Sequence, residues 1–157
     1  MELIGGEIVD TAPIGTRRLA WVVAVNHLLV ASGRGRYFVS VQNPISLGDE
    51  DDPQPDLSLL RSRPDPAAPR APGPADLLLV IEVSGTTLAH GRRVKLPLYA
   101  RAGIPEVGIV DLQNGFVEVY AGPSSGDYAG VRRYGRQDEL RSETVPDLGL
   151  PVADILG

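Results

Sequence analysis

Apolar residues follow two different spacings along the chain, which predict one long helix and several short strands. Between Thr16 and Ser32 the apolar residues recur at steps of three and four, the spacing of one helical face, and Thr16 is a favourable N-cap residue. The expected buried face of this helix comprises Leu19, Val22, Val23, Val25, Leu28, Leu29 and Val30. Shorter apolar runs predict strands at 7–9, 37–41, 57–60, 77–81 and 107–110.

The stretch Asp76–Asp111 organises the rest of the chain. Its first part, Leu77–Ile81, is a continuous apolar run, which is typical of a strand buried on both faces. A helical segment follows that either starts close to Pro97 or kinks there, and Gly103 supplies its stop. A second apolar run ends at Asp111, so we predict strand, crossover helix, strand.

Turn signals place the remaining segments. Residues 61–74 hold five prolines and are expected to form an extended surface loop inside a single domain that spans 1–157. Asn114 and Gly115 between two apolar runs are a strong hairpin signal, and further antiparallel strands are predicted at 128–134 and 139–144. We expect the C-terminal LGLPVADIL to pack as a short strand or a turn of helix.

Composition narrows the class of protein. An apolar fraction of 43% in 157 residues favours one globular domain, and no apolar run reaches the roughly 20 residues that span a bilayer. The chain has no cysteine, which excludes disulfides and thiolate zinc sites and fits the cytoplasm, and its acidic N-terminus does not resemble a secretory signal. A net charge of −5 argues against a surface that coats DNA, but an enzyme that engages nucleic acid locally stays open.

The basic residues are strongly biased toward arginine. Fourteen of the fifteen are Arg, and Lys95 is the single lysine. Because an ammonium is a compact and tunable charge, a lone lysine among arginines is a candidate for a site role. The alternative is that Lys95 is an exposed helix residue that happens not to be Arg.

Two carboxylates stand at the ends of successive predicted strands. Asp56 lies at the edge of the run 57–60, and Glu82 follows the run 77–81. Carboxylates held together by neighbouring strands suit a hard cation such as Mg²⁺ or Mn²⁺, with Lys95 nearby to neutralise charge at phosphorus or to orient water. The alternative is that Glu82 only caps the turn at 84–87.

Four motifs carry a resemblance to a known family. They are Pro-Asp at 55–56, Glu-Val-Ser at 82–84, Lys95 with Tyr-Ala four residues later, and Gly-Ile-Pro-Glu at 103–106 before a strand that ends in Val-Asp. As a set they resemble the Uma2 family of bacterial restriction-endonuclease-like proteins, also called DUF820, over almost the whole chain from Gly6-Glu7 onward.

The resemblance implies a fold and a site. The family is similar to the PD-(D/E)xK nucleases, which implies an α/β (α+β) fold: a restriction-endonuclease-like mixed sheet flanked by helices, with an added antiparallel hairpin region. It implies that Asp56, Glu82 and the Val83 carbonyl bind one or two Mg²⁺ or Mn²⁺ ions, and that Lys95 reaches in from the helix. The substrate would be nucleic acid, in the first instance DNA.

Other positions support or depart from this pattern. Glu7, Gln42 and Ser84 are candidate supporting residues, although solvent is the default place for a lone Glu such as Glu7. Ser84 stands where the usual lysine of the motif would be. Four further departures are Gly85 and Gly91 in place of acidic residues, Gly108 in place of an aromatic residue, and Arg18 in place of a His.

Two functions from different classes follow. The first is a metal-dependent endonuclease, and the second is a catalytically attenuated or inactive relative that acts as a binding or regulatory module. Loss of groups that support metal ligands weakens metal affinity, which keeps the second hypothesis open. We also expect a homodimer, because the apolar edges of the hairpin at 114–115 must be covered.

Overall fold

The computed structural model describes residues 1–10, 15–84, 94–145 and 147–157. Its centre is a six-stranded sheet in the order β3-β4-β5-β6-β7-β8, in which only β5 and β6 are parallel. The strands are β3 (Phe38–Val41), β4 (Leu57–Leu60), β5 (Leu77–Ser84), β6 (Glu106–Asp111), β7 (Phe116–Ser124) and β8 (Asp127–Gly135). The predicted mixed sheet flanked by helices is confirmed.

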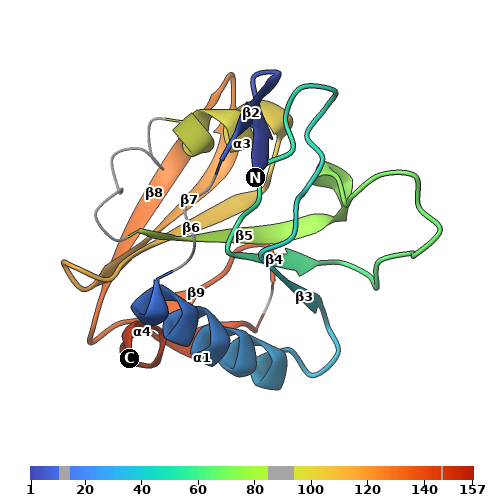
Figure 1. The fold of residues 1–157 in the computed structure, drawn as a ribbon. Coiled ribbons are helices and arrows are strands. Elements are labelled where there is room, and N and C mark those ends of the chain that lie inside the picture. Colours follow the sequence, from blue (N-terminus) through green and yellow to red (C-terminus); the bar gives the residue numbers. More distant parts are fainter. Residues whose placement is uncertain (11–14, 85–93, 146) are drawn as a thin grey trace.

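Helices cover the sheet on both faces (Figure 1). One face carries α1 (Thr16–Gly33) and α4 (Val152–Leu156) together with a small antiparallel pair, β9 (Glu139–Arg141) and β10 (Gly149–Pro151). The other face carries α3 (Leu96–Ala102), which connects β5 to β6. Two apolar clusters, one on each face, therefore enclose the central strands.

The central strands are buried on both faces, which explains their continuous apolar sequence. Every residue of β4 and β6 is buried, as is every residue of β5 from Leu77 to Val83. The strand β5 extends past the predicted end at Ile81, so Glu82 lies within it. The helix α3 starts next to Pro97 and ends at Gly103, whose φ of 80° is left-handed, as predicted.

The helix α1 confirms the predicted element but not its details. It begins at Thr16, yet Gly15 is the N-cap residue and no side chain caps the helix, so Thr16 as N-cap is wrong. The buried face is narrower than predicted: Trp21, Val22, Val25 and Leu29 are buried, whereas Leu19, Val23 and Val30 are exposed. A helix that contacts a sheet on one side buries one stripe, and apolar residues outside that stripe stay at the surface.

A hairpin at the N-terminus contains a strand that the sequence did not predict. The strand β1 (Glu2–Ile4) pairs with β2 (Glu7–Val9) across Gly5 and Gly6, which have φ values of 60° and 78°. Positive φ at both turn residues suits glycine. The hairpin is fastened to the segment that leads to β4, since Leu3 and Asp52 exchange two backbone hydrogen bonds of 3.3 and 2.8 Å.

The remaining elements agree with the predicted loops and hairpins. The Asn114-Gly115 hairpin joins β6 to β7, and Gly115 has a φ of 75°. The Pro-rich segment contains no strand or helix before a short 3-10 turn, η1 (Pro74–Asp76). In the part of the chain that the structure describes, no helix combines the length and apolar character needed to cross a membrane.

Candidate active site

Asp56 lies directly before β4 and opposite Glu82. The antiparallel register pairs Leu57 with Ile81. Asp56, one residue before Leu57, therefore faces Glu82, one residue after Ile81. Asp56 is 2% exposed, and its Oδ2 accepts a hydrogen bond of 2.8 Å from the Val83 amide. The backbone of Asp56 is also held in place, because the backbone N–H of Gln42 donates to the Asp56 carbonyl at 3.0 Å.

Arg18 neutralises Asp56. Its Nη2 lies 2.6 Å from Oδ1 and 2.8 Å from Oδ2 of the carboxylate. The arginine belongs to the first turn of α1, so this ion pair connects the start of that helix to the start of β4. A buried carboxylate requires such a partner, and Asp56 obtains it from Arg18.

Glu82 is also buried, with 7% of its surface exposed, and it contacts α3. Its Oε1 accepts hydrogen bonds from the Tyr99 hydroxyl at 2.5 Å and from Lys95 Nζ at 3.1 Å. Burial raises the pKa of Glu82 above its ordinary value of 4.5, and the Asp56 carboxylate adds to the rise, against the lowering by Lys95 and Tyr99. The charge of Asp56 thus acts on Glu82, as a neighbouring carboxylate in one site does.

Lys95 lies between two carboxylates immediately before α3. Its Nζ is 2.7 Å from Glu2 Oε1 and 3.1 Å from Glu82 Oε1. Burial lowers the pKa of Lys95, but Glu82 and Glu2 outweigh this effect, so the pKa is raised above 10.5 and the ammonium stays charged. The side chain is only 13% exposed, so the alternative of an exposed surface charge is wrong.

Tyr99 completes the contacts of Glu82. It is fully buried on α3, and burial, followed by the charge of Glu82, raises its pKa well above 10. The hydroxyl therefore keeps its proton and acts as a hydrogen-bond donor. The alternative role of Glu82 as a turn cap concerns residues 85–87, which lie outside the described part of the chain; the contacts seen for Glu82 are those to Tyr99 and Lys95.

Sequence reasoning missed Glu2 and Tyr99. Lys95 and Tyr99 are four residues apart, a spacing that places side chains on one helical face and is a signal for the tyrosine. The Gly5-Gly6 pair between apolar residues is a hairpin signal that would have revealed β1. Nothing in the sequence indicates that Glu2 reaches Lys95, because that contact depends on the packing of distant segments.

The candidate supporting residues differ in their positions. Glu7 is exposed on β2, the default place for a lone Glu, whereas Glu2 of the paired strand contacts Lys95. Gln42 is close to Asp56, but its contacts are made by backbone atoms: the carbonyl also accepts a bond from the Gln54 side chain. Ser84 ends β5, and its side chain, like all of Gly85 and Gly91, lies outside the described part.

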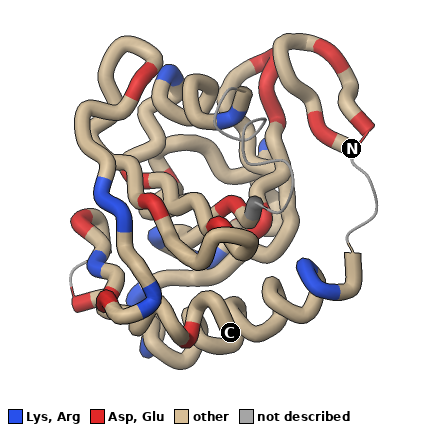
Figure 2. The backbone as a smooth tube through the Cα atoms, turned by 90° about the vertical axis from the view of Figure 1, so that its left-hand side faces the viewer, with Lys and Arg blue, Asp and Glu red and all other residues tan. Residues whose placement is uncertain are grey.

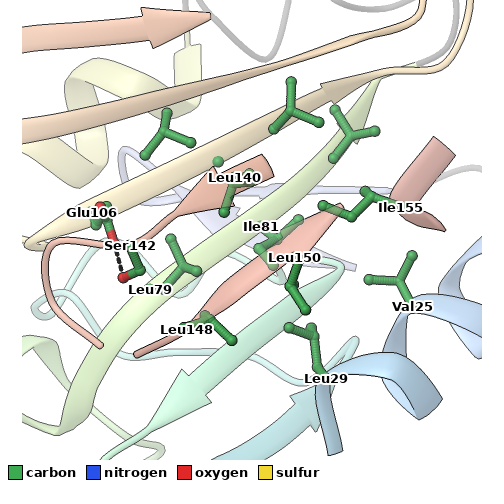
Figure 3. Close-up of a pocket in the computed structure, with 14 residues that line it drawn as sticks. Val25, Leu29, Leu79, Ile81, Glu106, Leu140, Ser142, Leu148, Leu150 and Ile155 are labelled. Carbon is green, nitrogen blue, oxygen red and sulfur yellow. Dashed lines mark hydrogen bonds between the residues drawn. The ribbon is translucent and has the colours of Figure 1, made fainter. Parts of the chain in front are cut away.

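A third strand carboxylate, Glu106, lies on the opposite face of the sheet and does not join the site. It accepts hydrogen bonds from Ser142 Oγ at 2.5 Å, Thr144 Oγ1 at 2.8 Å and the Glu143 amide at 3.0 Å. Figure 3 shows Glu106 and Ser142 beside apolar side chains that line a cavity of about 20 Å³. Gly108 also lines this cavity, so the missing side chain at this position leaves space in the core and not in the site.

The described residues include no group of three or more His, Cys, Asp or Glu side chains arranged to hold a metal ion. The donors present are the carboxylates of Asp56 and Glu82, hard oxygen ligands of the kind that Mg²⁺ prefers. Charges elsewhere are mixed: Figure 2 shows Lys and Arg positions interspersed with Asp and Glu, while acidic positions gather in the loops near the N-terminus.

The structure thus combines a mixed sheet that has helices on both faces with two buried carboxylates, Asp56 and Glu82, and a lysine beside them. The chain belongs to the Uma2 family, described as "Putative restriction endonuclease", whose model matches residues 1–153. A crystal structure of a "putative nuclease belonging to DUF820" from Anabaena variabilis ATCC 29413 is similar, with a TM-score of 0.78 and 13% identity over 99% of this chain and 88% of that chain. At that identity the similarity establishes the fold. No curated protein matches the chain.

Proposed function

We propose that this protein is a metal-dependent endonuclease that hydrolyses phosphodiester bonds of nucleic acid, in the first instance DNA. The observation that carries the proposal is a pair of buried carboxylates. Asp56, directly before β4, lies opposite Glu82 on β5, and a charged lysine contacts Glu82. Membership of a family described as "Putative restriction endonuclease" supports the nuclease class.

The charge balance of the site suits a cation. Three buried carboxylates, Glu2, Asp56 and Glu82, face two cationic side chains, Arg18 and Lys95, which leaves one negative charge in excess when all are ionised. Each carboxylate oxygen has two lone pairs, so Asp56 and Glu82 retain acceptor capacity beyond their present bonds. Mg²⁺ sites commonly use one or two carboxylates and complete their coordination with water and phosphate oxygens.

Asp56 and Glu82 would hold the metal, and the Val83 carbonyl is the third proposed ligand. When bound, such an ion lowers the pKa of a water molecule and stabilises the negative charge that develops on the phosphate. Arg18 and the Val83 amide orient Asp56, and Tyr99 orients Glu82. These contacts fix both carboxylates before substrate arrives.

Lys95 would act through its charge. Because its pKa is raised, the ammonium does not give up its proton near neutral pH, and it is not a general base. A fixed cation beside the metal ligand Glu82 instead stabilises the charge that forms on phosphate oxygens.

A second candidate function is a binding or regulatory module without cleavage activity. The observation that favours it is that side chains of the protein already balance the charge of both carboxylates. Arg18 contacts both oxygens of Asp56, and Lys95 contacts Glu82, so a metal ion would have to compete with these two cations. Gly85 and Gly91, in place of acidic residues, point the same way.

Cleavage of plasmid and single-stranded DNA with Mg²⁺ or Mn²⁺ tests the proposal. We expect Glu82→Gln to abolish cleavage and Lys95→Met to reduce the rate by about 10²–10³-fold, the usual effect of removing one electrostatic group. Glu106→Gln is the matched control, since it changes a buried strand glutamate on the opposite face of the sheet. If Glu82→Gln and Glu106→Gln cleave equally well, the assigned site is wrong. If the unaltered chain binds metal and DNA but does not cleave, the second function is favoured.

A further inference from the structure

The N-terminal hairpin contributes a carboxylate to the site. Glu2 on β1 is buried. Its Oε1 accepts hydrogen bonds from Lys95 Nζ at 2.7 Å and from the backbone N–H of Gln54 at 2.7 Å. Gln54 stands two residues before Asp56. One oxygen of Glu2 thus contacts both the lysine of the site and the segment that presents Asp56.

The hairpin holds Glu2 in place through contacts with residues 50–52. In addition to the two bonds between Leu3 and Asp52, the Gly6 amide donates to the Glu50 carbonyl at 2.9 Å and the Gly5 amide donates to Asp51 Oδ1 at 2.7 Å. The strand β1 and the turn of the hairpin are therefore fixed to the same segment. An ordinary surface hairpin does not need a buried carboxylate, so the ion pair with Lys95 requires a separate reason.

The geometry around Lys95 supplies that reason. Its ammonium lies closer to Glu2 than to Glu82, at 2.7 Å against 3.1 Å. Without the Glu2 charge, Glu82 would be the only carboxylate among the described residues left at the ammonium, and a metal ion would have to compete with that cation for Glu82. With Glu2 present, the ammonium is shared, and part of the charge of Glu82 stays available.

We propose that Glu2 is a positioning residue, which holds the Lys95 ammonium to one side of Glu82 and so leaves Glu82 able to bind a metal ion. The consequence for metal binding rests on the proposed function, whereas the positioning of Lys95 does not. The N-terminal hairpin is on this account part of the active site.

The single lysine of the chain makes the test direct. Protein labelled with ¹³C and ¹⁵N only in lysine gives one lysine side-chain signal, that of Lys95, whose chemical shift and side-chain order NMR measures. Glu2→Gln removes the charge but keeps an acceptor for the Gln54 amide, and Glu2→Asp restores the charge on a shorter side chain. Glu7→Gln is the matched control on the paired strand, because Glu7 is exposed.

We expect Glu2→Gln to shift the Lys95 signal and lower its order, Glu2→Asp to restore both in part, and Glu7→Gln to match the unaltered chain. Titration with Mn²⁺ alone should show about 10–100-fold weaker binding in Glu2→Gln, the usual cost of losing a residue that supports a metal ligand. In protein that already carries Lys95→Met, adding Glu2→Gln should weaken Mn²⁺ binding much less. This pattern separates a role through Lys95 from a general loss of stability.

The outcomes are distinguishable. If the Lys95 signal is the same in Glu2→Gln and in the unaltered chain, the inference is overturned, whatever the metal does. If Glu2→Gln weakens Mn²⁺ binding equally with and without Lys95, Glu2 acts by another route and the inference is again overturned. If the Lys95 signal changes but the unaltered chain binds no Mn²⁺, Glu2 positions Lys95 as inferred and the proposed metal-dependent function fails.

Discussion

The hydrogen bond from Tyr99 to Glu82 predicts a stability loss that depends on pH. Tyr99→Phe removes a hydroxyl 2.5 Å from Glu82 Oε1 and keeps the ring, which is fully buried against the sheet. A hydrogen bond to a charged group contributes about 1.5–3 kcal/mol, whereas a neutral one contributes about 0.5–1.5 kcal/mol. For a chain of this size, a loss of 1.5–3 kcal/mol lowers the Tm by roughly 3–12 °C.

The direction of the pH dependence follows from the pKa of Glu82. Burial raises that pKa in the folded state, so the corresponding stability is present at low pH and is lost as pH rises through the folded-state pKa. The Tyr99 hydroxyl lowers the pKa and limits this loss. Tyr99→Phe raises the pKa of Glu82 further, so the variant continues to lose stability as pH rises above the folded-state pKa of the unaltered chain, where the loss in the unaltered chain ends.

Urea unfolding at several values of pH between 4.5 and 8 measures the effect. Tyr128→Phe is the control, because the Tyr128 hydroxyl donates to the neutral Ile104 carbonyl at 2.8 Å and is likewise buried. Its cost should stay near 0.5–1.5 kcal/mol at each pH, while that of Tyr99→Phe grows with pH. A Tyr99→Phe cost that is small and independent of pH, as in the control, would refute the ionised Glu82 at this contact.

Three further predictions concern the core, the ion pair of Asp56 and the assembly. Gly108→Ala should raise the free energy of unfolding by about 1 kcal/mol, because its Cβ would lie 3.8 Å from Ile81 Cγ1 beside the cavity; an unchanged urea midpoint would contradict this. Arg18→Ala should lower the free energy of unfolding by about 1–3 kcal/mol, less than the loss of a fully buried ion pair, because Arg18 is 43% exposed. Mn²⁺ should then raise the Tm of this variant more than that of the unaltered chain. A dimer is expected in light scattering at micromolar concentration, and a monomer mass would count against it. The edges of the hairpin at 114–115 do not supply the reason, because its strands β6 and β7 pair with β5 and β8 inside the sheet.

Local sequence signals predicted the strands and the helix next to Asp56, Glu82 and Lys95, but not the strand β1 that carries Glu2. The apolar runs before Glu82 and after Asp56 gave the correct strands, and Pro97 and Gly103 gave the correct limits of α3. Side chains alternate along a strand, so the pairing of Leu57 with Ile81 brings the two acidic residues to the same place. That pairing is a property of the folded sheet, and the sequence suggested it only through the order of the strands.

The errors arose where the answer depends on distant segments. The spacing of apolar residues correctly predicted the helix α1 but not which of these residues are buried. Leu19 and Val23 are exposed, because the sheet covers only one stripe of the helix. The same limit applies to Arg18 and Glu2, whose partners Asp56 and Lys95 are far away in the sequence. Such ion pairs are long-range contacts, and no periodicity or motif encodes them.

Titration of Mn²⁺ into the unaltered chain, Glu82→Gln and Glu106→Gln tests the central claim most directly. A bound ion stabilises the native state by an amount that grows with the ratio of metal concentration to Kd, so calorimetry and the Tm give independent readings. We predict that the unaltered chain and Glu106→Gln bind Mn²⁺ with equal affinity and gain Tm, while Glu82→Gln binds at least tenfold more weakly. Equal affinities in all three proteins, or no binding in any, would contradict a metal site at Asp56 and Glu82.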